Sequence, residues 1–261
     1  MIGDSPLVNA LRPSANFGGR AEGIATDILL LHYTDMPTAD AAIAWLADPR
    51  SQVSCHYVVA EDGTITQLVS ERDRAWHAGV STWKGQGDIN SRSIGIEIAN
   101  CGHDHGYPDF PDVQIEAVIA LGCDICARNP IPAARVLAHS DVAPGRKRDP
   151  GEKFPWARLA GAGLGHFVEP EPIRGGRFFQ IGDHGAPVEA LQGLLAWYGY
   201  GLDIDGDFGT DTQQVVAAFQ RHFRPERVDG VADASTIATL HRLARALTPP
   251  AGQGAAEMAR D

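Results

Sequence analysis

Two short apolar runs that each end in a histidine constrain the fold of this chain most. Residues 27–33 have the sequence DILLLHY, and residues 136–139 have the sequence VLAH. An apolar run without polar residues at alternate positions is typical of a strand that is buried on both faces of a sheet. We therefore expect two central strands that deliver His32 and His139 to the rim of one sheet.

A short basic loop follows the second run and carries an aspartate. Residues 140–151 have the sequence SDVAPGRKRDPG. Its Pro-Gly turn predicts a stiff loop that brings Lys147 and Asp149 back beside the strand end. Histidine and aspartate both bind zinc, and two histidines with one aspartate leave a fourth position open. An open position is typical of a catalytic metal site rather than a structural one.

The other segments before residue 160 predict strands and helices in mixed order. A hairpin turn at 61–63 joins two of the strands, and apolar residues at helical spacing mark the helices. The predicted strands are 54–60, 64–69, 93–99 and 135–138, and the predicted helices are 39–46 and 109–129. This order indicates an α/β fold with a mixed central β-sheet flanked by helices.

The pattern changes after Trp156. Residues 161–176 are rich in Gly, Pro and Glu and have no sustained period, as is typical of a linker. Apolar residues at helical spacing then predict three short helices. We expect a first domain at 10–168, a linker at 169–177, a three-helix domain at 178–248 and a disordered tail at 249–261.

Charge and hydropathy narrow the classes of partner and compartment. The net charge is −11 and no basic block offsets it, so we expect no nucleic-acid partner. No apolar run reaches the length of a membrane span, so we expect no transmembrane segment. The first residues lack the features of a secretory signal, which favours a cytoplasmic location, with a periplasmic or wall-associated one as the alternative if a signal was removed. The oligomeric state has no signature in the sequence.

Five segments, taken together, resemble a known enzyme family. In chain order they are LLLHYT (29–34), VSCHYVVAEDGTITQLV (53–69), AWHAG (75–79), NSRSIGIEIAN (90–100) and LAHSDVAPGRKRDPG (137–151). The first domain resembles the zinc-dependent N-acetylmuramoyl-L-alanine amidases, the superfamily that includes AmpD-type amidases, the phage T7-type lysozyme and the peptidoglycan recognition proteins. The resemblance implies hydrolysis of the amide between N-acetylmuramic acid and L-alanine in peptidoglycan or muropeptides.

The three-helix domain resembles the peptidoglycan-binding domain that is commonly appended to cell-wall hydrolases. The matching segments are VEALQGLLAWYGYGLDIDGDFGTDTQQVVAAFQ (188–220) and VDGVADASTIATL (228–240). The resemblance implies a domain that does no chemistry, but that holds the enzyme on the polymer and raises the effective substrate concentration.

The resemblance also implies roles for individual residues. Glu97, in SIGIE, occupies the position of the catalytic glutamate, and Lys147 the position that stabilises the developing oxyanion. Trp76 and His77, in AWHAG, line the substrate cleft. The implied zinc ligands are His32, His139 and Asp149.

Each residue also has a simpler interpretation. A lone strand-end histidine is more often structural than a ligand, Glu97 could be a solvent-facing partner of an arginine, and Lys147 could belong to a solvated basic turn. We expect His56 to have a packing role or to support the metal ligands from behind, and His103 and His105 to lie in a polar loop near the cleft mouth.

Two other functions stay open at the level of sequence. A binding or sensing module could keep the fold without the metal, and a zinc endopeptidase could cut within the stem peptide on the same scaffold. The complete ligand set argues against the first, and analysis of the products would exclude the second. The Gly-containing segment 79–90 is a candidate for a mobile lid.

Overall fold

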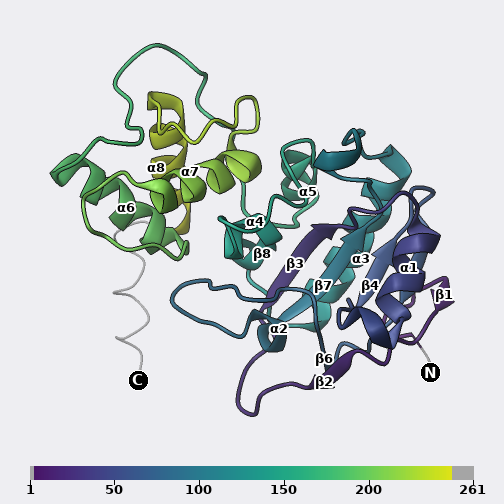
Figure 1. Ribbon diagram of the computed structural model, residues 1–261. Coiled ribbons are helices and arrows are strands. Elements are labelled where there is room, and N and C mark those ends of the chain that lie inside the picture. The colour runs from purple at the N-terminus through teal and green to yellow at the C-terminus, as the bar shows by residue number, and fades with distance from the viewer. Residues whose placement is uncertain (1–2, 249–261) are drawn as a thin grey trace, which may run out of the picture.

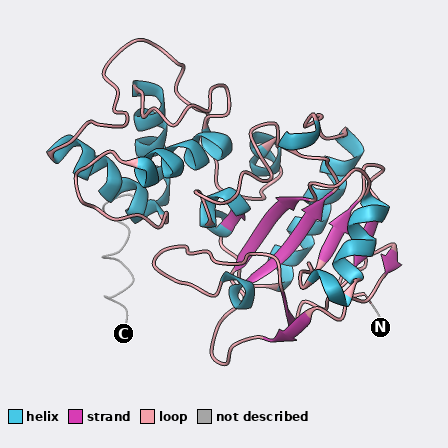
Figure 2. Cartoon of the chain, in the orientation of Figure 1, coloured by secondary structure: helices cyan, strands magenta, loops and turns pink. Residues whose placement is uncertain are grey.

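Strands and helices alternate through the first part of the chain, whereas the second part is helical (Figures 1 and 2). The structure is a computed structural model that describes residues 3–248. The tail predicted at 249–261 lies outside the described residues. Among the described residues, no helix combines the length and apolar character that crossing a bilayer requires.

A six-stranded mixed sheet lies at the centre of the first part (Figure 2), which confirms the predicted fold class. The strand order is β1-β5-β4-β7-β3-β8, with parallel pairing except for the β4–β5 hairpin. The strands are β1 (Ala10–Leu11), β3 (Ile28–Tyr33), β4 (Tyr57–Val59), β5 (Ile65–Gln67), β7 (Ser93–Ile98) and β8 (Val136–Ala138). A separate ribbon pairs β2 (Phe17–Gly19) with β6 (Asp73–Ala75).

Helices surround this sheet. The longest, α3, begins directly after Pro111 and ends before Asn129, close to the predicted bounds. The helices of the first part are α1 (Ala39–Ala47), α2 (Ile89–Arg92), α3 (Asp112–Arg128), α4 (His139–Val142) and α5 (Trp156–Gly161), with 3₁₀ turns η1 (Pro49–Ser51), η2 (His103–His105) and η3 (Ala133–Arg135).

One face of the sheet packs against α3. Because side chains alternate along a strand, every second residue of the central strands points to this face. The resulting apolar cluster includes Leu29 and Leu31 of β3, Ile94, Ile96 and Ile98 of β7, and Ile115, Val118, Leu121 and Ile125 of α3. This cluster accounts for the period-2 and period-3.6 patterns in the sequence.

The opposite face contributes to an apolar cluster that extends into the second part of the chain. Ile28, Leu30 and Leu137 belong to one apolar cluster with side chains of the three C-terminal helices. Those helices are α6 (Ala186–Tyr198), α7 (Thr210–Phe223) and α8 (Ala234–Leu247), as predicted in number. The two parts of the molecule therefore share a continuous core.

The segment between the two parts has no regular helix or strand and packs along α8. The backbone N–H of Glu171 donates a hydrogen bond to Thr239 Oγ1 at 3.0 Å, and its carboxylate forms an ion pair with Arg242 at 2.9 Å. The predicted linker thus has fixed partners on the helical domain.

Candidate metal centre

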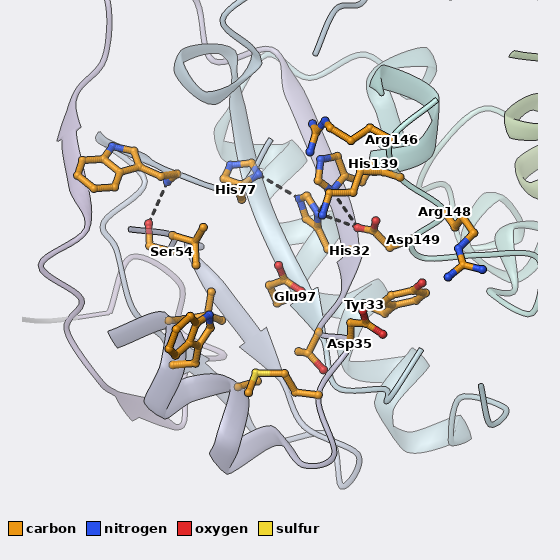
Figure 3. Close-up of a pocket in the computed structure, with 18 of the residues that line it drawn as sticks. His32, Tyr33, Asp35, Ser54, His77, Glu97, His139, Arg146, Arg148 and Asp149 are labelled. Atoms are coloured by element: carbon orange, nitrogen blue, oxygen red, sulfur yellow. Dashed lines mark hydrogen bonds and ion pairs between the residues drawn. The ribbon is translucent and has the colours of Figure 1, made fainter. Parts of the chain in front are cut away.

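Three buried side chains converge at one end of the central strands (Figure 3). Because β3 and β8 are parallel and Leu31 pairs with Ala138, the next residues, His32 and His139, lie side by side. Asp149 reaches the same point from the loop after α4. His32 Nδ1 and His139 Nδ1 lie 2.9 Å apart, and each lies 3.0 Å from Asp149 Oδ2.

The second ring nitrogen of His139 fixes the tautomer of that ring. His139 Nε2 lies 3.0 Å from the carbonyl oxygen of Ala78, which can only accept a hydrogen bond. Nε2 therefore carries a hydrogen, and when the ring is neutral its Nδ1 points a lone pair at Asp149. Without a cation between them, that lone pair and the carboxylate oxygen would repel each other.

A chain of hydrogen bonds leads to the same conclusion for His32. The Ser93 hydroxyl donates to the carbonyl of Ile89 at 2.6 Å, so Ser93 Oγ accepts from His77 Nε2 at 3.4 Å. His77 Nδ1 is then an acceptor, and His32 Nε2 donates to it at 3.0 Å. This leaves His32 Nδ1 with a lone pair. Burial lowers the pKa of His32 to about 4, which keeps the ring neutral at pH 7.

This donor set fits a zinc ion. Zinc–nitrogen and zinc–oxygen bonds of about 2.0–2.1 Å in a tetrahedron place neighbouring ligand atoms about 3.3 Å apart. The three atoms here lie 2.9–3.0 Å apart, so a small expansion of the triangle would accommodate the ion. Two neutral imidazoles and a carboxylate are the ligand types that zinc prefers.

The position of His77 depends on a glycine in the neighbouring strand. A Cβ atom at Gly95 would lie 2.6 Å from two atoms of the His77 ring, which is closer than packing allows. His77 lines the cleft, as the resemblance implies, but it also hydrogen-bonds to His32, which sequence reasoning missed. The signal was the glycine of SIGIE, on the same side of the strand as Glu97.

A cleft of about 330 Å³ opens beside the three converging side chains. Its apolar side includes residues of α1 and the segment after it, among them Ala42, Trp45, Leu46 and Val53. Trp76, from the segment after β6, also lines it. Its charged side includes Glu97 and Lys147.

Glu97 lies on the same face of the sheet as His32, because the two residues pair in register across β7 and β3. Its Oε2 atom is buried and has no hydrogen-bond partner within residues 3–248. Burial, and then the nearby Asp149, raise the pKa of Glu97 well above its ordinary value. The side chain is therefore a carboxyl with a raised proton affinity and an oxygen without a partner among the described residues, and not a solvent-facing partner of an arginine.

The three basic residues of the 146–148 loop have different contacts. Arg146 donates hydrogen bonds to the carbonyls of Ala78 and Val80 at 2.6 and 2.8 Å, and Arg148 forms an ion pair with Asp104 at 2.7 Å. Lys147 lines the cleft and has no ion-pair partner in the described part of the chain. Of the three, only Lys147 has a side chain with neither a hydrogen bond nor an ion pair to another described residue, so its charge is available to a ligand.

The remaining histidines of the first domain contribute no atom to the converging set. His56 accepts a hydrogen bond from the backbone N–H of Gly95 at 2.9 Å and is fully buried. His103, in η2, bonds to the Tyr33 hydroxyl at 2.9 Å and to Glu152 at 3.0 Å.

The segment 79–90, a candidate lid, is anchored at its centre. Trp83 is fully buried, with its ring 5.1 Å from that of Tyr200. The backbone N–H of Lys84 donates to the carbonyl of Gly199 at 2.7 Å. Because the tip of the segment is bound to the second domain, it is not free to open over the cleft as a lid.

Comparison with known proteins identifies both parts of the chain. The N-acetylmuramoyl-L-alanine amidase family model matches residues 22–152, and the peptidoglycan binding domain model matches residues 184–240. N-acetylmuramoyl-L-alanine amidase AmiD of Escherichia coli K12 is 40% identical over an alignment of 243 residues, which covers 87% of this chain and 83% of the relative.

Two solved structures are also similar over most of their length. E. coli AmiD, in complex with anhydro-N-acetylmuramic acid-L-Ala-D-γ-Glu-L-Lys, has 37% identity and a TM-score of 0.72, covering 87% of this chain and 92% of that one. AmpDh3 of Pseudomonas aeruginosa, in complex with an anhydromuramic pentapeptide, has 31% identity and a TM-score of 0.72, covering 88% and 96%. The resemblance seen in the sequence is confirmed, and the chain belongs to the N-acetylmuramoyl-L-alanine amidase family.

Proposed function

We propose that this amidase is zinc-dependent and cleaves the bond between the lactyl group of N-acetylmuramic acid and L-alanine in muropeptides and peptidoglycan. The observation that carries the proposal is the convergence of two histidine lone pairs and a carboxylate oxygen beside a cleft. The proposed ligands are His32, His139 and Asp149. Zinc at this site would lower the pKa of water toward neutrality and polarise the scissile carbonyl.

Glu97 is the proposed general base and acid. It would take a proton from the attacking water and deliver it to the leaving amine nitrogen of L-alanine. Two features support this role. The carboxyl lies on the same sheet face as His32, and its Oε2 atom has no protein partner among the described residues. Its raised pKa suits a group that must hold a proton between the two transfers.

Lys147 is the proposed stabiliser of the oxyanion. During attack, the carbonyl oxygen of the substrate becomes negative, and a fixed positive charge beside it lowers the barrier, typically by about 3 kcal/mol. The lysine lines the cleft and has no ion pair to break within the described chain.

The substrate class is supported by the relatives. AmiD and AmpDh3 were both solved with anhydromuramic peptides, and a cleft with one apolar and one charged side suits a sugar carrying a peptide. Trp76 is a proposed substrate contact on the cleft wall, and so is His77. The second domain is proposed to bind the polymer and to raise the local substrate concentration. The cytoplasmic location stays a prediction, which fractionation of the producing cells would check.

Mass spectrometry of the products tests the proposal. The zinc-loaded protein, a chelated sample and a chelated sample with zinc restored are each incubated with an anhydro-muropeptide and with peptidoglycan. We expect free stem peptides that begin with L-alanine, lost on chelation and regained with zinc. Fragments cut inside the stem peptide would instead indicate an endopeptidase. Full cleavage after complete removal of the metal would contradict the zinc requirement.

A further inference from the structure

A buried carboxylate of the first domain is held by two side chains of the second. Asp141 is fully buried in α4, two residues after His139. Its Oδ1 accepts a hydrogen bond from the Tyr200 hydroxyl at 2.7 Å, and its Oδ2 from His222 Nδ1 at 2.7 Å. The family match alone assigns these contacts no role.

The same carboxylate fixes the backbone from which His139 projects. Asp141 Oδ2 also accepts from the backbone N–H of Ala138 at 2.8 Å, at the junction where β8 becomes α4. That junction sets the direction in which His139 leaves the strand. A buried carboxylate needs donors in place, so loss of those from the second domain would displace Asp141 and the junction with it.

Packing leaves His222 little freedom. Its ring stacks on Trp156 of α5 at a centroid distance of 3.7 Å and on Phe223 at 3.8 Å, and the side chain is buried. An imidazole clamped between two aromatic rings presents its Nδ1 to Asp141 in one orientation. The donor is therefore pre-organised by residues of both domains.

A second set of contacts links the second domain to the imidazole ring of His139. The carbonyl of Ala78 accepts from His139 Nε2, and the segment that follows Ala78 carries Trp83 into the second domain. Gly199 makes room for that ring, since a Cβ atom there would lie 2.3 Å from it. The second domain thus holds the backbone of His139 through Asp141, and its imidazole through the 78–83 segment.

We infer that the second domain is a structural part of the metal centre, in addition to any contact it makes with polymer. Tyr200 and His222 are positioning residues that hold His139 through Asp141. The inference rests on the proposed function, which makes His139 a zinc ligand. Partners that orient a metal ligand typically contribute 10–100-fold to metal affinity, so we expect Tyr200→Phe to weaken zinc binding by about 10-fold.

The chain offers a matched control for this variant. Tyr198 is also buried in the second domain, and its hydroxyl bonds to His166 Nδ1 at 2.9 Å and not to Asp141. Tyr198→Phe and Tyr200→Phe each remove one buried hydroxyl from the same region. A general loss of stability would follow from both, whereas a change at the metal would follow from Tyr200→Phe alone.

His222 allows a loss-and-rescue pair. His222→Leu removes the donor to Asp141, and His222→Asn restores an N–H group near the position of Nδ1. We expect the leucine variant to bind zinc about 10-fold more weakly and the asparagine variant to recover most of that affinity.

The experiment uses the full chain and three measurements. Zinc affinity is measured by competition with a chelator, ligand geometry by the visible absorption of the cobalt-loaded protein, and turnover on a small soluble anhydro-muropeptide, which needs no attachment to polymer. We expect Tyr200→Phe and His222→Leu to lower affinity, shift the cobalt bands and slow turnover, and Tyr198→Phe to match wild type in all three.

The outcomes separate this inference from the proposed function. If wild type binds zinc and cleaves the peptide, but Tyr200→Phe and His222→Leu do the same with unchanged cobalt bands, the inference is wrong and the proposed function stands. Equal losses in Tyr198→Phe and Tyr200→Phe would also overturn it, because they would indicate general destabilisation. A wild-type protein that binds no zinc would overturn both.

Discussion

The two faces of the central sheet use alternate residues of the same strands but are completed by different parts of the chain. On one face, Leu29 and Leu31 pack against α3 of the first domain. On the other, Ile28 and Leu30 belong to an apolar cluster that extends into the second domain, and the next residue on that face is His32. One cluster closes within the first domain, and the other continues into helices that come much later in the sequence.

Because of this difference, substitutions on the two faces should differ in whether they affect only the stability of the fold or also the metal site. The α3 face is mainly apolar, so a change there should cost stability without reaching the cleft. On the opposite face, one strand carries both apolar core residues and a proposed metal ligand. A change in the packing of that core should therefore also affect the metal ligands. Four experiments test this contrast, beginning with the largest expected effect.

Asp149→Ala removes one donor of the converging set on the site face. We expect loss of bound zinc and a fall in turnover on the order of 10⁴-fold, since the water and the carbonyl then lose their activating ion. Metal analysis of the purified variant and assay of released stem peptide would measure the two effects. Retention of a full equivalent of zinc would contradict the assignment of Asp149.

Glu97→Gln leaves the donor set intact and removes only the proton-carrying group. We expect wild-type zinc content and turnover lower by about 10²–10⁴-fold, the usual contribution of general acid–base catalysis. Metal analysis would measure the zinc content, and single-substrate kinetics would measure the turnover, so that the two effects are distinguished. Near-normal turnover in a zinc-replete variant would make the catalytic assignment of Glu97 wrong.

Leu121→Ala and Leu30→Ala compare the two faces directly. Both leucines are fully buried, and each truncation should lower the free energy of unfolding by about 2–5 kcal/mol, measured by urea titration. Only Leu30→Ala, on the site face, should also weaken zinc binding. Equal zinc affinities in the two variants would show that both faces affect zinc binding to the same extent, which would contradict the contrast.

Gly95→Ala has the smallest expected effect and acts through His77. The added Cβ would displace the ring that accepts from His32, so we expect zinc affinity about 10-fold lower by chelator competition. Gly193→Ala, in α6, is the control, because a Cβ there meets no atom within 4 Å and alanine favours the helix. If both variants bind zinc as wild type does, the His77–His32 contact has no positioning role.

The sequence predicted the parts of the molecule that depend on short-range pattern. Strand ends next to histidines brought His32 and His139 to one rim, and helical spacing placed α3 within a few residues of its observed bounds. The strand expected at 54–60 is shorter, Tyr57–Val59, and before it the backbone N–H of Ser54 donates to the carbonyl of Trp76, which lies outside the central sheet.

Contacts between distant segments could not be predicted in this way. Nothing near Asp141 in the sequence indicates that Tyr200 and His222 will bind its carboxylate. The 79–90 segment resembles a flexible loop by composition, yet Trp83 is buried in the other domain. Local patterns carry no information about which later helix will cover a given face. These contacts could therefore be found only in the three-dimensional structure.

The core that both domains share bears on how the chain can be divided. A protein built from independent modules can exchange one module for another at the linker, because each module keeps a closed core of its own. Here a cut at the linker would divide one apolar cluster and leave the ring of Trp83 without Tyr198 and Tyr200, which it contacts in the second domain. The binding domain therefore cannot be exchanged for another without disrupting the core. The two domains should unfold together on heating, as a single cooperative unit.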